Sequence, residues 1–275
     1  MSFLRPAARQ FATHASRTLF THAAPNALHP TKFRALKPVL LGSAALCSVV
    51  LALNFHPTVQ LDAELPAAKQ IETTADPATG IEFPNTLQVP AKVKLPGHAL
   101  VGVGVRTVSF LGIKVYSVAF YADLENPNLK VPRNLTPDEK IKHIVNNTSC
   151  VIRIVPTRST SYTHLRDAFM RTLHSRMAVG RKDGTITEEI EQAAASPLRK
   201  LKSLFPNSPL AKHTPLDIYL TPPTPGKPRS LVFRDMGAIE DNWVATELVL
   251  AYFDGDGPSP PLKKSVTSRL EAFEK

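Results

Sequence analysis

Residues 100–123 read LVGVGVRTVSFLGIKVYSVAFYAD and carry the strongest structural signal in the chain. Their content of Val, Ile and aromatic residues predicts two β-strands joined by a turn at Leu111-Gly112. Because side chains alternate along a strand, Gly102, Gly104 and Arg106 share one face of the first strand. Two glycines leave that face bare. We therefore expect a bulky group to lie against the backbone there, with one guanidinium at its edge.

Arg106 and Tyr116 are the candidate binding residues of this predicted hairpin. An arginine within an apolar strand is costly to bury unless an anion or a hydrogen-bond acceptor meets it. The alternative is an edge-strand arginine that points into water. Tyr116 shares its face with Val118 and Phe120, which suit an acyl or flat hydrophobic ligand. Alternatively, Tyr116 is a packed aromatic with its hydroxyl at the sheet edge.

The composition is that of a globular protein, with 43% hydrophobic and 20% charged residues. The net charge of +10 is concentrated at the N-terminus, because residues 1–61 hold six basic residues and no acidic one. The other 27 basic residues face 23 acidic ones, a net charge of +4, so nucleic-acid binding has little support. Cys47 and Cys150 have no zinc-site spacing, and an internal disulfide is not expected. We expect Cys150 to be a small core residue.

The first 84 residues predict targeting and attachment segments. Residues 1–37 carry Arg, Ser and Thr without acidic residues, as mitochondrial transit peptides do. Residues 38–56 are uncharged and long enough for one transmembrane helix, with a buried core helix as the alternative. Basic residues before this segment would stay in the matrix, so the domain would face the intermembrane space from the inner membrane. Residues 57–84 are Pro-containing and predict a linker to a domain at 85–275.

The domain shows strands first and helices mostly later, which predicts an α+β fold with one sheet face covered. Thr136-Pro137-Asp138-Glu139 has the composition of a helix start. A strand is expected at 150–155, and a helix capped by Ser161 follows, with an apolar stripe. Pro197 should kink or divide the next helix. Other expected elements are strands at 216–220 and 230–234 and helices at 243–253 and 262–273.

Three stretches resemble one family. Gly104-Val-Arg106 and Ile113–Tyr121 resemble the opening hairpin of the chalcone isomerase fold. More narrowly, they are similar to the chalcone isomerase-like proteins of fungal mitochondria, the altered inheritance of mitochondria group. Residues 151–169 and 243–260 resemble the same group. The resemblance covers about residues 85–275 and implies a curved antiparallel sheet under a layer of helices, with a ligand cleft between them.

The resemblance also implies roles for single residues. In chalcone isomerases a strand arginine, matched by Arg106, holds the ionised phenol of the substrate during intramolecular ring closure. A family Thr falls on Tyr116, a family Lys on Arg153, and the Tyr of the family's helix on Tyr162. A family Asn falls on Phe169, which cannot hydrogen bond a flavonoid hydroxyl. This departure argues against flavonoid isomerisation.

Arg106 followed by a Lys-Val-Tyr sequence is instead similar to the fatty-acid-binding members of the fold, in which both residues hold a carboxylate. The leading expectation is thus a membrane-tethered domain that binds a small apolar anion, first of all a fatty acid. Arg106 and Tyr116 would bind the charged end, and three further side chains are expected to contact the ligand: Arg153, Tyr162 and Phe169.

Three alternatives stay open. Haem is the second candidate ligand, with His164 as a possible iron ligand, although a solvated histidine on the helix surface would look the same. An intramolecular lyase or isomerase would use Arg106, Tyr116 and Tyr162 as catalytic groups. A non-catalytic scaffold of the inner membrane is the third. The sequence indicates no other cofactor and no metal site.

Overall fold

The structure, a computed structural model, describes residues 71–91 and 95–275. The predicted transit peptide at 1–37 and the predicted membrane span at 38–56 lie outside the described residues, as does Cys47. Within the described ranges, no helix combines the length and the apolar composition that a bilayer crossing requires.

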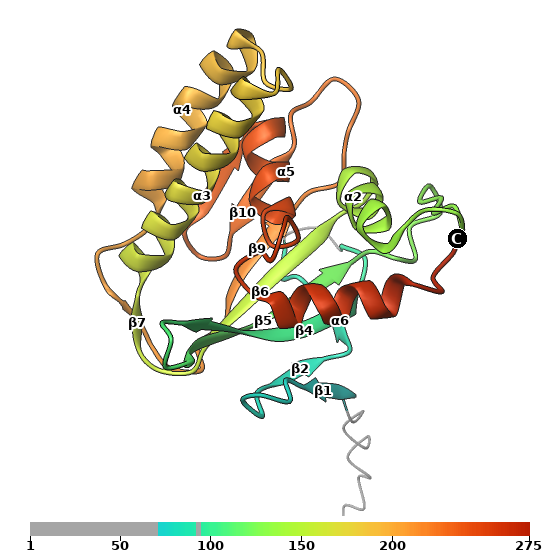
Figure 1. Cartoon of the computed structure of the whole chain (residues 1–275), viewed down its shortest axis with the longest axis vertical. Helices are drawn as coiled ribbons and strands as arrows, with labels where there is room; N and C mark the ends of the chain where they lie inside the picture. The colour runs from blue at the N-terminus through green and yellow to red at the C-terminus, as the bar shows by residue number, and fades with distance from the viewer. Residues whose placement is uncertain (1–70, 92–94) are drawn as a thin grey trace, which may run out of the picture. The chain divides into compact units, whose positions relative to one another are not determined.

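Seven antiparallel strands form the main sheet in the order β11-β10-β9-β6-β5-β4-β3 (Figure 1). Sequence neighbours are mostly sheet neighbours, whereas β6 pairs with β9 across an excursion that contains α3 and α4. Cys150 at the start of β6 is fully buried, as predicted. The strands are β3 (Thr86–Leu87), β4 (His98–Val108), β5 (Ile113–Ala122), β6 (Cys150–Pro156), β9 (Leu216–Leu220), β10 (Ser230–Phe233) and β11 (Gly237–Glu240).

The β4–β5 hairpin confirms the interpretation of residues 100–123. Arg106 lies opposite Tyr116 in the register of the two strands. Ser109 and Gly112 have positive φ angles of 65° and 62°, so the chain reverses through left-handed residues, where glycine is favoured. The hairpin therefore places the guanidinium and the phenol next to each other on neighbouring strands.

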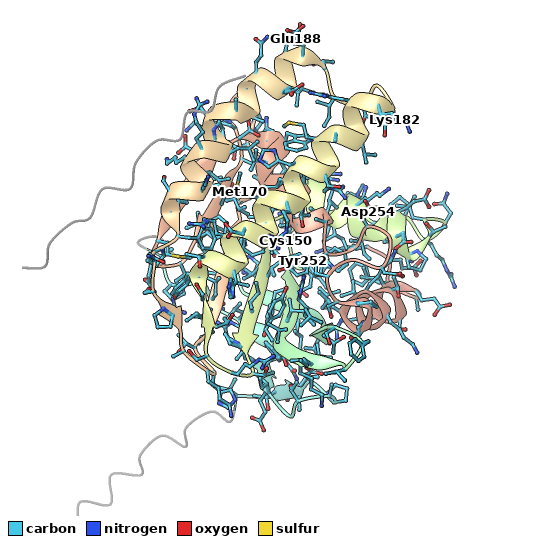
Figure 2. The ribbon with its side chains drawn as sticks, turned by 60° about the vertical axis from the view of Figure 1, so that its left-hand side comes forward. Cys150, Met170, Lys182, Glu188, Tyr252 and Asp254 are labelled. Atoms are coloured by element: carbon cyan, nitrogen blue, oxygen red, sulfur yellow. The ribbon has the colours of Figure 1, made fainter. Side chains whose placement is uncertain are left out.

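Five described helices cover one face of this sheet, which confirms the predicted α+β architecture (Figure 1). Residues from all five share one hydrophobic core with the inner face of the sheet. In Figure 2, Lys182 and Glu188 flank the turn that joins the two longest helices. The helices are α2 (Pro137–Asn147), α3 (Tyr162–Lys182), α4 (Glu188–Leu204), α5 (Asn242–Leu250) and α6 (Pro260–Leu270).

Local sequence explains where these helices begin. Thr136 and Glu139 form a capping box at the start of α2, and the Ser161 hydroxyl accepts a hydrogen bond from the Thr163 amide at the start of α3. Pro197 lies inside α4, which continues from Glu188 to Leu204. The expectation that Pro197 divides the helix is therefore wrong, and the kink, its alternative, stays a prediction. Proline removes one backbone hydrogen bond, and the burial of Ala194, Leu198 and Leu201 holds the helix together around it.

Helix α6 is the bulky group that occupies the bare glycine face of β4. A Cβ atom at Gly104 would lie 2.7 Å from Leu262 Cα and still nearer to the Leu262 backbone nitrogen. The Ser259 hydroxyl, at the start of α6, donates a 2.8 Å hydrogen bond to the Val105 carbonyl. Glycine is thus required by the close approach of two backbones, and the ligand space lies further along the sheet, beside Arg106.

The opposite face of the sheet carries a smaller apolar cluster that includes Phe83, Leu100 and Tyr121. Phe83 comes from β2 (Glu82–Pro84), which pairs with β1 (Thr73–Ala75). The predicted linker at 57–84 therefore contains two described strands, β1 and β2. The Asp76 carboxylate accepts a 2.6 Å hydrogen bond from the Ser117 hydroxyl on β5 and so fastens this segment to the sheet.

Candidate ligand-binding site

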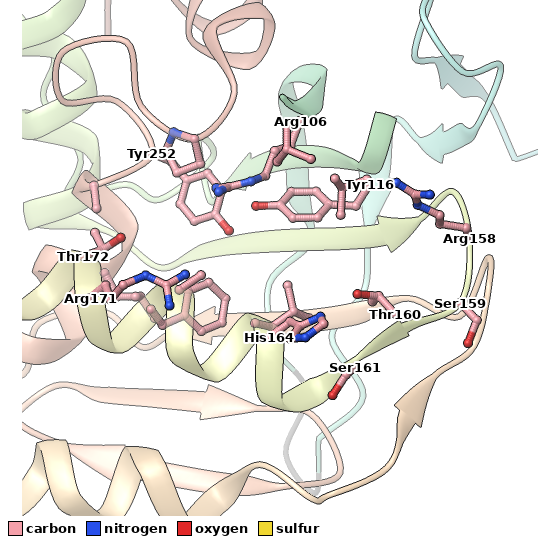
Figure 3. A pocket seen from close by; sticks show the side chains of 18 residues that line it. Arg106, Tyr116, Arg158, Ser159, Thr160, Ser161, His164, Arg171, Thr172 and Tyr252 are labelled. Atoms are coloured by element: carbon pink, nitrogen blue, oxygen red, sulfur yellow. The ribbon is translucent and has the colours of Figure 1, made fainter. Parts of the chain in front are cut away.

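A cavity of about 610 Å³ lies between the sheet and α3 (Figure 3). This volume falls within the roughly 300–1,000 Å³ that is typical of small-molecule sites. The ends of β4 and β5 form one wall, and residues 158–161, which include β7 (Thr160–Ser161), form the mouth of the cavity. Helix α3 and the chain from the end of α5 to Pro258 complete it.

Three polar side chains converge at one end of the cavity. Arg106 Cζ lies 5.8 Å from the centre of the Tyr116 ring. Figure 3 shows the hydroxyls of Tyr116 and Tyr252 pointing toward each other beside the Arg106 guanidinium. Tyr116 and Tyr252 are 3% and 2% exposed, so both phenols are held in place by the surrounding core. One cation and two hydroxyls thus face a shared point, an arrangement suited to a carboxylate.

The Tyr252 hydroxyl is buried, and the Tyr116 phenol lies close enough to act on it as a hydrogen-bond partner, but no hydrogen bond of normal geometry is formed among the described residues. Burial raises the pKa of Tyr252 well above the usual value; the neighbouring Tyr116 phenol acts in the same direction, and the Arg106 charge opposes it. Tyr252 therefore stays protonated through neutral and mildly alkaline pH and keeps a proton to donate. A buried donor without a partner is costly, so an acceptor bound in the cavity would relieve that cost.

The rest of the cavity combines an apolar wall with a cationic rim. Its larger apolar side chains are Val108, Val115, Leu165, Phe169 and Leu248. Two further cations, Arg158 and Arg171, and the imidazole of His164 also line the cavity. The lining contains no acidic residue.

Arg106, Arg158 and Arg171 have no ion-pair partner within residues 71–91 and 95–275. Asp254 (labelled in Figure 2) borders an adjoining hollow and is paired with Arg176 at 2.6 Å. A hydrogen bond from Arg166 lowers the pKa of the Asp167 carboxyl, and the Arg171 charge lies near enough to add a smaller effect in the same direction. Arg106 and Arg158 have no such described carboxylate, which favours an anionic ligand.

Of the residues expected to form the site, the structure brings four together: Arg106, Tyr116, His164 and Phe169 all line the cavity. Val118 and Phe120 share the face of Tyr116, as predicted, but both are fully buried below the helices and do not line the cavity. Tyr162 is half-buried beside the core and is also absent from the lining.

Arg153 lies on the opposite face of the sheet. Its neighbours in β6, Ile152 and Ile154, belong to the helix-side core, so strand alternation turns Arg153 away from the helices. The guanidinium makes two hydrogen bonds, of 2.6 and 2.8 Å, to the Asp217 carboxylate on β9. Arg153 thus has a structural partner outside the cavity.

Sequence reasoning missed Tyr252, Arg158 and Arg171. Tyr252 follows α5 and reaches Arg106 only because the chain folds back, so no local pattern indicates it. Arg171 lies on α3 two residues after Phe169, and Arg158 in the β6–β7 turn, and both resemble ordinary surface residues. Within the described residues, no group of three or more His, Cys, Asp or Glu side chains is placed to hold a metal ion.

The fold and site define an α+β domain with an arginine-containing ligand cavity between an antiparallel sheet and its helices. The family profile described as chalcone isomerase like matches residues 97–144 and 134–267, more than half of the chain. The chain belongs to the chalcone isomerase-like family.

Several relatives carry the name Altered inheritance of mitochondria protein 18, mitochondrial. The Eremothecium gossypii protein is 25% identical over 61% of this chain and 62% of its own length, and the Debaryomyces hansenii protein is 23% identical over 93% of each. A Schizosaccharomyces pombe protein is 35% identical over 39% of this chain and 44% of its own length. The match thus spans less than two thirds of two of these relatives.

Among solved structures, an Arabidopsis thaliana fatty-acid binding protein matches with a TM-score of 0.52. The match covers 74% of this chain and 100% of that chain, at 18% sequence identity. At this identity the likeness shows a shared fold.

Proposed function

We propose that the domain binds a fatty acid in the cavity, with the carboxylate at Arg106, Tyr116 and Tyr252. The observation that carries the proposal is a guanidinium without an acidic partner beside two buried phenols, at one end of an apolar cavity. The Arabidopsis thaliana protein of the same fold is named as a fatty-acid binding protein, which supports the same ligand class.

The two ends of a fatty acid match the two parts of the cavity. A guanidinium binds a carboxylate through charge-assisted hydrogen bonds, which are stronger than neutral ones. The hydrocarbon chain would lie along Leu165, Phe169 and Leu248, where each buried CH₂ group contributes about 0.8 kcal/mol. Phe169, which argues against a flavonoid hydroxyl as ligand, is well suited to an acyl chain.

We also propose that the protein acts in mitochondria, tethered to the inner membrane by residues 38–56. The names of the relatives support mitochondrial location. Protease treatment of mitochondria with ruptured outer membranes should then digest the domain, because it would face the intermembrane space. A domain that survives this treatment would place it in the matrix.

Fatty-acid binding is tested by titrating the purified full chain with a fluorescent long-chain fatty acid and displacing it with unlabelled acids. We expect saturable binding of one ligand per chain and displacement by long-chain acids but poorly by short-chain ones. The lack of saturable binding would contradict the proposal. Flavanone formation from chalcone would favour the lyase, and a Soret band lost in His164→Ala would favour haem.

Tyr252→Phe should weaken fatty-acid binding without destabilising the fold. The variant removes a buried hydroxyl that makes no hydrogen bond of normal geometry within the described residues, so the free energy of unfolding should change little. The bound carboxylate loses one donor, which we expect to weaken affinity about 10-fold, equivalent to the roughly 1.5 kcal/mol at the lower end of the range for hydrogen bonds to a charged group. Urea unfolding and ligand titration measure the two effects. Unchanged affinity would remove Tyr252 from the site.

A further inference from the structure

The turn between β4 and β5 exposes an apolar cluster. The described residues leave five large hydrophobic side chains exposed, and three of them lie here: Val108 at 38%, Phe110 at 97% and Leu111 at 70%. The other two, Ile71 and Val179, occur singly, as exposed apolar residues commonly do. An aromatic and an aliphatic side chain adjacent at a hairpin tip instead indicate a contact surface.

Hydrogen bonds define the conformation of the hairpin tip. The Leu111 amide donates a 3.1 Å hydrogen bond to the Ser109 hydroxyl, and the Gly112 amide donates one of 3.1 Å to the Ser109 carbonyl. At the base of the turn, the Thr157 hydroxyl donates hydrogen bonds of 2.7 and 3.0 Å to the carbonyls of Lys114 and Val115. The β6–β7 turn therefore supports the hairpin from the side, and the exposure of Phe110 is a property of the folded state.

The surroundings of the tip are basic. Arg158 in the β6–β7 turn and Lys212 after β8 (Pro209–Leu210) are exposed. Lys114 on β5 is also exposed, but its ammonium donates a 2.5 Å hydrogen bond to the Ala78 carbonyl. The His213 amide donates a 2.9 Å hydrogen bond to the Pro156 carbonyl, which places the segment of Lys212 beside that of Arg158. The three segments, residues 105–116, 156–166 and 207–215, contain no Asp or Glu. Apolar side chains at the tip with cations behind them are complementary to an anionic lipid surface.

The geometry points to a membrane-docking hairpin: Phe110 and Leu111 insert into the interface of an anionic bilayer while Arg158 and Lys212 contact lipid headgroups. Val108 and Arg158 belong both to this surface and to the lining of the ligand cavity. Docking would thus bring the cavity mouth to the bilayer, where fatty acids partition. This last step, ligand exchange with the bilayer, rests on the proposed function, whereas docking itself does not.

Tryptophan depth measurements on the full chain reconstituted into vesicles test the docking. Phe110→Trp reports on the hairpin, Val179→Trp on the far end of α3 is the matched control, and the signal of native Trp243 is subtracted. Val179 is 60% exposed and lies about 26 Å from Tyr162 along α3, at 1.5 Å per residue. The vesicles contain phosphatidylcholine, with or without phosphatidylglycerol, and brominated acyl chains as quenchers.

With phosphatidylglycerol present, the emission of Phe110→Trp should shift to the blue, and shallow bromines should quench it, since interfacial side chains lie about 5–10 Å deep. Val179→Trp should show neither change. Equal signals at both positions, or none at Phe110→Trp, would overturn the proposal. A shift that depends on protein density in the vesicles instead of lipid composition would identify a second copy of the chain as the occupant. Fatty-acid titration of Phe110→Ser without vesicles should match the wild type. The docking proposal and the fatty-acid proposal can therefore be contradicted independently of each other.

Discussion

Gly104→Ala is expected to lower the free energy of unfolding by about 3 kcal/mol or more, at or above the upper end of the range for overpacked cores. The added Cβ would lie 2.7 Å from Leu262 Cα, and backbone atoms cannot rotate away as a side chain does. Alanine gains only about 0.5–1 kcal/mol over glycine within a strand, which is too little to compensate. The clash therefore outweighs this gain, so the net change in the free energy of unfolding is destabilising, and α6 must separate from β4.

Urea unfolding monitored by circular dichroism measures this change, and limited proteolysis shows whether α6 is released first. Gly97→Ala is the matched control, because its Cβ would meet mainly the Gln88 side chain, with Nε2 at 2.9 Å, and that flexible group can move. The control should unfold near the wild-type urea concentration. If Gly104→Ala did so too, close packing of α6 on β4 would be the wrong explanation for this glycine.

The sequence predicts the local structure of this domain well, because local structure depends on alternation, caps and turns. The two strands of the hairpin follow from the alternation of residues 100–123, and the start of α2 follows from Thr136-Pro137-Asp138-Glu139. The continuity of α4 across Pro197 has a tertiary cause. The apolar residues of α4 are buried on both sides of the proline, and packing outweighs one lost hydrogen bond.

The site is less predictable than the fold, because its residues come from distant parts of the chain. Arg106 and Tyr116 are indicated by one hairpin, but Tyr252 approaches them only after α5 and α6 pack on the sheet. The placement of Arg153 can be predicted from the sequence, since alternation in β6 puts it on the face opposite Ile152 and Ile154. The bare glycine face indicated a bulky neighbour but not that the neighbour would be a helix of the same chain.

Arg106→Gln is expected to weaken the binding of a long-chain fatty acid about 10- to 150-fold. This range corresponds to the roughly 1.5–3 kcal/mol contributed by hydrogen bonds to a charged group. Glutamine keeps much of the side-chain length and can donate one hydrogen bond, but it removes the charge and the second donor of the fork. The domain should remain folded, because Arg106 is only partly buried and has no described ion-pair partner. Fluorescent fatty-acid titration of the full chain measures the loss.

Two comparisons separate recognition of the carboxylate from general filling of the cavity. Arg158→Gln removes an exposed cation at the mouth and should change affinity less than about fivefold, as solvent-exposed charges do. A fatty-acid methyl ester has the same hydrocarbon chain but no charge, so wild-type protein should prefer the acid, and Arg106→Gln should bind both nearly alike. If the variant weakened acid and ester equally, Arg106 would shape the cavity without binding the anion. A loss confined to the acid would place the carboxylate at the guanidinium, beside Tyr116 and Tyr252.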